Sequence, residues 1–150
     1  MAGVTIYAKD VPFSFHASVV DAARQAAAAA ALTTMAAFVT AQNRPDLQPV
    51  FTLIDSVTFF ETDIANGPYI MNRSFTDLPS RQFNWMLSEF LDPNHRDCSR
   101  ATYYFHDAFH IHQFATAGDV YPADHPTQAQ WEVDAITEQV GAVHALGCGQ

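Results

Sequence analysis

The sequence predicts an α+β fold in which a small antiparallel sheet packs against about four helices, in a single domain spanning residues 1–150. Short stretches rich in β-branched and aromatic residues alternate with turn signals in the first half of the chain. Helical spacing of apolar residues dominates the second half. The length suits one hydrophobic core, and no repeat or linker divides the chain.

The N-terminal segment predicts two short strands followed by a long helix. Residues 4–8 and 11–16 have strand character, with an interruption near the Asp-Val-Pro sequence between them. Residues 18–42 are rich in alanine, which has the highest helix propensity of all residues. Ser18 or Asp21 can cap this helix, and the Asn-Arg-Pro sequence that follows ends it.

The middle of the chain predicts two strands and a further helix. Residues 50–60 are β-branched and aromatic, and an Asn-Gly-Pro turn separates them from a returning strand over residues 69–75. Residues 80–91 are predicted to be helical because their apolar side chains recur at helical spacing. The residues of this stripe are Phe83, Met86, Leu87, Phe90 and Leu91.

Two helices are expected to close the domain. The first runs from about Ser99, a suitable N-cap, to Ala117, where Gly118 stops it. A polar loop leads to the second helix, which runs from about Thr127 to Leu146.

Charge and composition exclude several classes of function. The formal net charge of −9 argues against binding to a nucleic-acid backbone. No apolar run is long enough to span a membrane, and no secretion signal is recognisable, so we expect a cytoplasmic protein with no membrane partner. Cys98 and Cys148 do not form a metal-binding or redox pair motif and are expected to be free thiols.

Two histidines on the first of the closing helices suggest a metal site. His106 and His110 are four residues apart, so their side chains lie roughly 40° apart around the helix axis and one turn along it. Imidazole at this spacing suits Zn²⁺. His112 lies roughly 120° further round the helix than His110 and is not expected to bind the same ion.

A third ligand is expected on the last helix. Glu132 borders a predicted apolar stripe, whereas Asp134 and Glu138 point away from it. His144 also lies near the stripe and is the alternative to Glu132. The stripe consists of Ala129, Val133, Ile136, Val140 and Val143. Two histidines and one glutamate leave a coordination position open for water, as in catalytic zinc sites.

These residues resemble the zincin metallopeptidases of the gluzincin kind, in their minimal form. That family carries HExxHxxQ, then a glycine, then ExEA, and the sequence here has His106-Asp107-Ala108-Phe109-His110-Ile111-His112-Gln113, Gly118 and Glu132-Val133-Asp134-Ala135. The resemblance covers about residues 99–146, and the order of a long helix, a small sheet, a metal helix and a ligand helix is also similar. It implies that His106, His110 and Glu132 bind zinc in a hydrolase acting on peptide or other amide bonds.

The sequence departs from this family at the catalytic position. The family has a glutamate after the first histidine, which acts as general base, and Asp107 stands there with a side chain one methylene shorter. One alternative is therefore a zincin-like metal-binding or interaction module with weak or no turnover. Another is a non-peptidase metal enzyme, because HDxxH also occurs in a metal-dependent decarboxylation family of coenzyme Q biosynthesis, where the downstream glutamate is closer.

Overall fold

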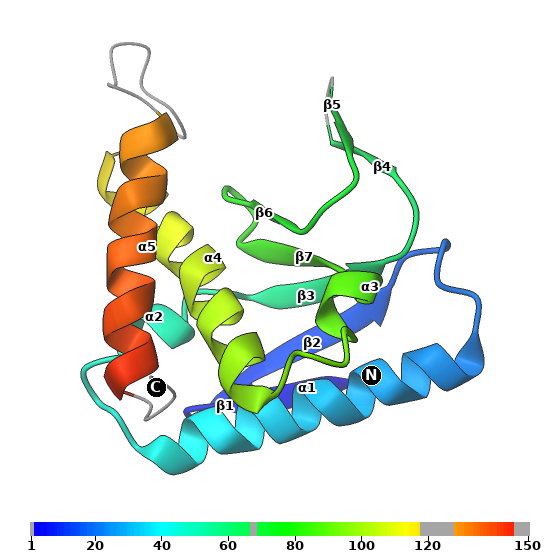
Figure 1. The fold of residues 1–150 in the computed structure, drawn as a ribbon, viewed down its shortest axis with the longest axis horizontal. Coiled ribbons are helices and arrows are strands. Elements are labelled where there is room, and N and C mark those ends of the chain that lie inside the picture. The colour runs from blue at the N-terminus through cyan, green and yellow to red at the C-terminus, as the bar shows by residue number, and fades with distance from the viewer. Residues whose placement is uncertain (1, 67–68, 118–127, 146–150) are drawn as a thin grey trace.

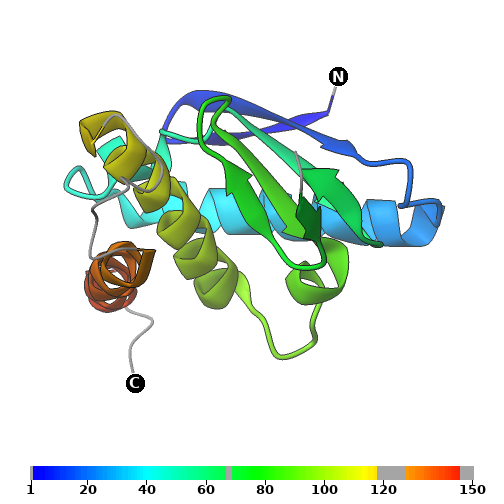
Figure 2. The ribbon, with the colours of Figure 1, turned by 90° about the horizontal axis from the view of Figure 1, so that it is seen from above.

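The computed structural model describes residues 2–66, 69–117 and 128–145, and for Glu132 and His144 it describes the backbone alone. Within these residues a mixed sheet forms one layer, two long helices lie against one of its faces, and the C-terminal helix packs on the outer side of the second of them (Figures 1 and 2). The predicted combination of helices and a small sheet in one fold is confirmed. The prediction that the sheet is antiparallel is wrong, because its central strands are parallel.

The main sheet has five strands in the order β1-β2-β3-β7-β6. The outer pairs β1–β2 and β6–β7 are antiparallel, whereas β2–β3 and β3–β7 are parallel. Helix α1 forms the crossover from β2 to β3, and parallel neighbours require a crossover of this kind. The strands are β1 (Gly3–Ile6), β2 (Lys9–Phe15), β3 (Ser56–Phe60), β6 (Phe75–Asp77) and β7 (Gln82–Met86).

Five helices are present in the described part of the chain. They are α1 (Ala22–Gln42), α2 (Gln48–Phe51), α3 (Leu87–Phe90), α4 (Asp97–Ala117) and α5 (Gln128–Ala145). The predictions of α1, α4 and α5 are confirmed. Asp21, one of the two predicted caps, accepts a hydrogen bond from the backbone N–H of Ala23 at 2.8 Å, whereas the Ser18 hydroxyl accepts from the backbone N–H of Glu61.

The predicted helix over residues 80–91 is wrong for most of its length. Strand β7 occupies its first half, and only the short helix α3 follows. Phe83 and Trp85 alternate toward the same face of the sheet and stack with their ring centroids 4.5 Å apart. Phe83 fits both the alternation of a strand, which repeats every two residues, and the apolar stripe of a helix. Pairing with β3 therefore decides the conformation of this segment.

Two predicted strands are each divided in the structure. Residues 50–60 contain the end of helix α2 before β3 begins at Ser56. Residues 69–75 contain β5 (Tyr69–Met71), which pairs antiparallel with β4 (Ile64–Asn66), and the start of β6. Part of the Asn-Gly-Pro turn lies outside the described residues. The β4–β5 hairpin stands away from the main sheet, above β6 in Figure 1.

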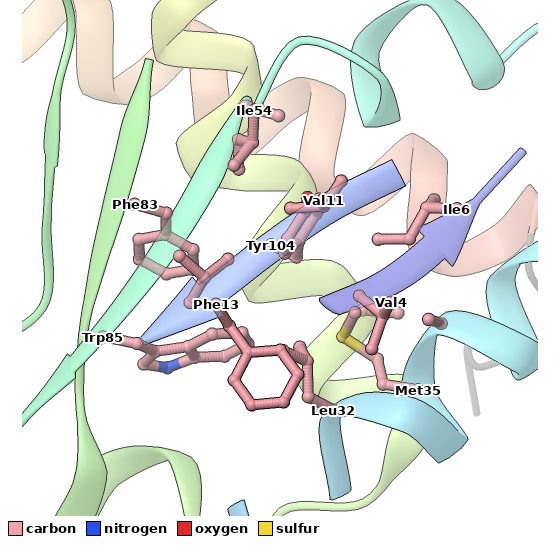
Figure 3. Packing of buried hydrophobic residues seen from close by; sticks show 14 of the residues in the cluster. Val4, Ile6, Val11, Phe13, Leu32, Met35, Ile54, Phe83, Trp85 and Tyr104 are labelled. Atoms are coloured by element: carbon pink, nitrogen blue, oxygen red, sulfur yellow. The ribbon is translucent and has the colours of Figure 1, made fainter. Parts of the chain in front are cut away.

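The core lies between the sheet and the helices. Buried side chains of β1, β2, β3 and β7 face α1 and α4, and Figure 3 shows Trp85, Phe83 and Tyr104 among them. The opposite face of the sheet carries polar residues, including Ser14 and Thr58, whose hydroxyl groups lie 3.3 Å apart. Helix α4 contacts β6 and, through the ring of Tyr104, Phe83 and Trp85 of β7.

Helices α4 and α5 pack side by side and run in opposite directions (Figures 1 and 2). Helix α4 begins at Asp97, two residues before the predicted cap Ser99. Cys98 is disulfide-bonded, so the expectation of a free thiol at this position is wrong. Cys148 lies outside the described residues. None of the described helices is long and apolar enough to cross a membrane.

Candidate metal centre

His106 and His110 turn their rings toward each other from the same face of α4. Their Nε2 atoms are 3.2 Å apart, and the ring centroids are 4.8 Å apart at an interplanar angle of 81°. Both side chains are half-buried. The spacing of four residues on a regular helix therefore brings the two rings together as the sequence predicts.

Each histidine is held through its other ring nitrogen by a glutamine. Nδ1 of His106 lies 3.0 Å from Oε1 of Gln139 on α5, and Nδ1 of His110 lies 2.7 Å from Oε1 of Gln113 on α4. An amide oxygen only accepts hydrogen bonds, so both Nδ1 atoms act as donors. In the tautomer that these hydrogen bonds select, the lone pair of each ring is on Nε2, where the two histidines face each other.

This arrangement fits a pair of zinc ligands. Two nitrogens bound tetrahedrally at about 2.0–2.1 Å from zinc are about 3.3 Å apart, close to the separation of the two Nε2 atoms here. Two lone pairs facing each other across this distance repel unless a cation or a proton lies between them. Hydrogen bonds that fix the tautomer of a ligating histidine are a regular feature of metal sites.

The packed face of α5 differs from the stripe that the sequence suggested. Val133 and Ile136 are 54% and 49% exposed, so the prediction is wrong for these two members of the stripe, and the side chains of the other three lie outside the described part. Among the described side chains of α5, Ala135 and Ala142 are buried, and the half-buried Gln139 between them reaches His106. Small side chains at these positions let α5 approach α4 closely.

The position of Glu132 on α5 follows from this corrected face. It precedes Ala135 by three residues and Gln139 by seven, spacings that keep residues on one side of a helix. Asp134 and Glu138 are exposed. The side chains of Glu132 and of the alternative His144 lie outside the described part, so the third ligand stays a prediction. Among the described residues, no group of three His, Cys, Asp or Glu side chains could hold a metal.

Asp107 lies on the adjacent face of α4, toward the edge of the sheet. Its Oδ1 atom accepts a hydrogen bond of 2.9 Å from the hydroxyl of Thr76 on strand β6. The side chain is half-buried and lines a cavity of about 280 Å³. Asp107 therefore places a carboxylate in the wall of this cavity, on the same helix as the histidine pair.

The cavity lies between α4, β7 and the segment around α3. Its walls combine aromatic side chains with ionisable side chains. No sequence motif indicated this combination. They include Phe83 and Trp85 from β7, Glu89 from α3, His95 from the following loop, and Tyr103 and Asp107 from α4. Nδ1 of His95 lies 2.6 Å from the backbone oxygen of Glu89, which fixes the orientation of the ring.

Neighbouring polar residues on α4 have other surroundings. His112 is exposed, and its ring packs 5.4 Å from that of Phe109. Tyr104 is fully buried in the core, where desolvation raises the pKa of its phenol far above the usual value. Tyr104 therefore stays protonated and away from the cavity.

Gln113 and Gln139 are the two residues of this centre to which sequence reasoning gave no role. Gln113 could have been found, because it lies three residues after His110 on the same helix face. Nothing in the sequence pairs Gln139 with His106, because that contact depends on how α5 docks on α4. No family model matches the chain, and no curated protein or solved structure is significantly similar to it.

Proposed function

We propose that the protein is a zinc-dependent hydrolase of metallopeptidase type, with His106, His110 and Glu132 as the metal ligands. The observation that carries this proposal is the convergence of the two Nε2 atoms, with both Nδ1 atoms fixed by glutamine. Imidazole and carboxylate donors suit zinc, which in such sites polarises a carbonyl group and acidifies a bound water.

Each residue of the proposed site would have a distinct role. His106 and His110 would supply their Nε2 atoms as the two nitrogen ligands, and the glutamines hold the rings in place before any ligand binds. Asp107 serves as the general base, receiving a proton on its carboxylate. The hydroxyl of Thr76 orients this carboxylate through Oδ1 and connects the metal helix to the edge strand.

The position of β6 supports a peptide as the substrate. This strand lies at the edge of the main sheet, beside Asp107, and pairs with β7 on its inner side. An edge strand offers backbone N–H and C=O groups that can pair with an extended peptide. A peptide bound along β6 would pass the face of α4 that carries Asp107.

The second candidate function is a metal-binding or interaction module of similar fold that does not turn over substrate. The observation that favours it is the hydrogen bond between Thr76 and Asp107, because it holds a carboxylate that is already one methylene shorter than that of glutamate. A displacement of about 1 Å can reduce a catalysed rate by on the order of 100-fold.

A comparison of Glu132→Gln with Asp134→Asn tests the proposed ligand set. We expect Glu132→Gln to weaken zinc binding by at least roughly 10- to 100-fold, the loss typical of changes around a metal site, because a neutral amide replaces a charged ligand. Asp134→Asn removes the same charge at an exposed position of α5 and should leave the affinity nearly unchanged. Competitive zinc titration measures both variants. A larger loss in Asp134→Asn would show that another carboxylate binds the metal.

The cytoplasmic location stays a prediction, and the disulfide bond at Cys98 argues against it. Stable disulfides are rare in the reducing cytosol and common in exported proteins. A location in an oxidising compartment agrees with the bond at Cys98.

A further inference from the structure

The cavity beside Asp107 has the size of a pocket for a single side chain. Its volume of about 280 Å³ lies just below the range of roughly 300–1,000 Å³ found for pockets that take drug-sized ligands. Tyr103, which is 44% exposed, forms an apolar wall against which an aliphatic stem can pack, whereas the lining residues Phe83 and Trp85 are almost fully buried behind the cavity surface.

The charge of the cavity is negative. Glu89 and Asp107 both line it, and no lysine or arginine does so among the described residues. The carboxylate of Glu89 is half-buried, and Oε2 accepts a hydrogen bond of 3.0 Å from Ser74. None of the salt bridges of the described part involves Glu89. A half-buried carboxylate without a cationic partner favours a ligand that supplies one.

The expected cation is organic rather than metallic. Glu89, His95 and Asp107 share the cavity, but they do not form a group of three that could hold a metal ion. Tyr103 is 44% exposed, and its ring packs 5.2 Å from that of His95, so the part of the residue that His95 leaves open is accessible to a guanidinium or ammonium group. Carboxylates together with aromatic walls match the two parts of a lysine or arginine side chain.

We infer that this cavity binds the cationic side chain of a lysine or arginine in the substrate peptide, with Glu89 as the specificity-determining residue. The role in substrate selection rests on the proposed function, in which Asp107, part of the same cavity lining, is the general base. Binding of the cation itself does not depend on catalysis. Ser74 holds Glu89 in place by donating its hydroxyl hydrogen while accepting the backbone N–H of Met86 at 2.8 Å.

Titration with N-acetyl-arginine amide, followed by NMR in the presence of zinc, tests the inference. The neutral isostere N-acetyl-citrulline amide is the matched probe. We expect saturable shifts at Tyr103 and His95 with the arginine probe and no saturable binding of the citrulline probe. Glu89→Gln, which retains an acceptor for Ser74, should weaken arginine binding roughly 10-fold or more. Glu138→Gln removes an exposed carboxylate of α5 and should change nothing.

A fluorogenic peptide library separates this inference from the proposed function. Cleavage that prefers lysine or arginine in wild type and loses the preference in Glu89→Gln supports both. Cleavage without this preference, together with equal binding of the two probes, overturns the inference and leaves the hydrolase intact. Saturable arginine binding without cleavage of any peptide supports the pocket and contradicts the hydrolase. Because the two probes are compared on the wild-type protein, a folding defect in Glu89→Gln cannot obscure the result.

Discussion

His110→Ala is expected to abolish zinc binding at stoichiometric concentrations. The substitution removes one of two Nε2 donors that lie 3.2 Å apart, and it also releases Gln113, whose Oε1 lies 2.7 Å from the ring. A single remaining histidine with a carboxylate cannot complete a tetrahedral zinc site without two further ligands. Isothermal titration with zinc, on protein first stripped with a chelator, measures the loss.

His112→Ala is the matched control for this experiment. It removes an imidazole from the same helix, two residues away, at an exposed position that faces Phe109 rather than His106. We expect its zinc affinity to remain that of the wild type. Equal losses in the two variants would mean that the ligand set is wrong, or that both act by unfolding α4, which circular dichroism distinguishes.

Asp107→Glu is expected to raise peptide hydrolysis by on the order of 100-fold. The longer side chain extends the carboxylate by one methylene, which restores the general base of the HExxH motif. The cavity beside Asp107 has room for this extension. The value of kcat/KM on a peptide substrate, measured with zinc bound, is the relevant quantity.

Asp63→Glu provides the control for the same chemical change. Asp63 is exposed and lies between β3 and β4, away from α4, so activity should not change. If wild type and Asp107→Glu both bind zinc but cleave no peptide, the metal-binding module is the better account. If Asp107→Glu lowers an existing peptide cleavage, the expected increase is contradicted, and Asp107 is already the better base at this position.

The parts of the fold that could be predicted are those with strong local signals. The alanine-rich α1, with Asp21 as its cap, and the long helices α4 and α5 were recognisable from composition and spacing. Strand β7 was not, because Phe83 and its neighbours fit both a helical stripe and a strand. Pairing with β3 on one side and β6 on the other selects the strand, and the pairing with β3 joins distant segments of the chain.

The candidate site was predictable to the extent that it lies on one helix. The approach of His106 and His110 follows from helix geometry alone, and so does the separation of His112. The face of α5 was misjudged because Val133 and Ile136 were assumed to be buried, whereas Ala135 and Ala142 are. Residue size, rather than hydrophobicity, decides which face of α5 can approach α4.

The cavity beside Asp107 was beyond sequence reasoning. Its lining comes from segments between residues 74 and 107, and the spacing of these residues follows no local pattern. Glu89 and His95 line the same cavity as Asp107 because α3 and the following loop fold over the end of β7. A pocket that is formed by tertiary packing therefore cannot be predicted from local sequence patterns.

The zinc content of the purified protein, after equilibration with zinc and removal of the unbound metal, tests the central claim most directly. The account predicts about one equivalent per chain, because His106, His110 and Glu132 form a single site. Less than about one tenth of an equivalent in folded protein would contradict it. A proton bound between the two Nε2 atoms would then join the histidine pair, and neither the metal centre nor the hydrolase would stand.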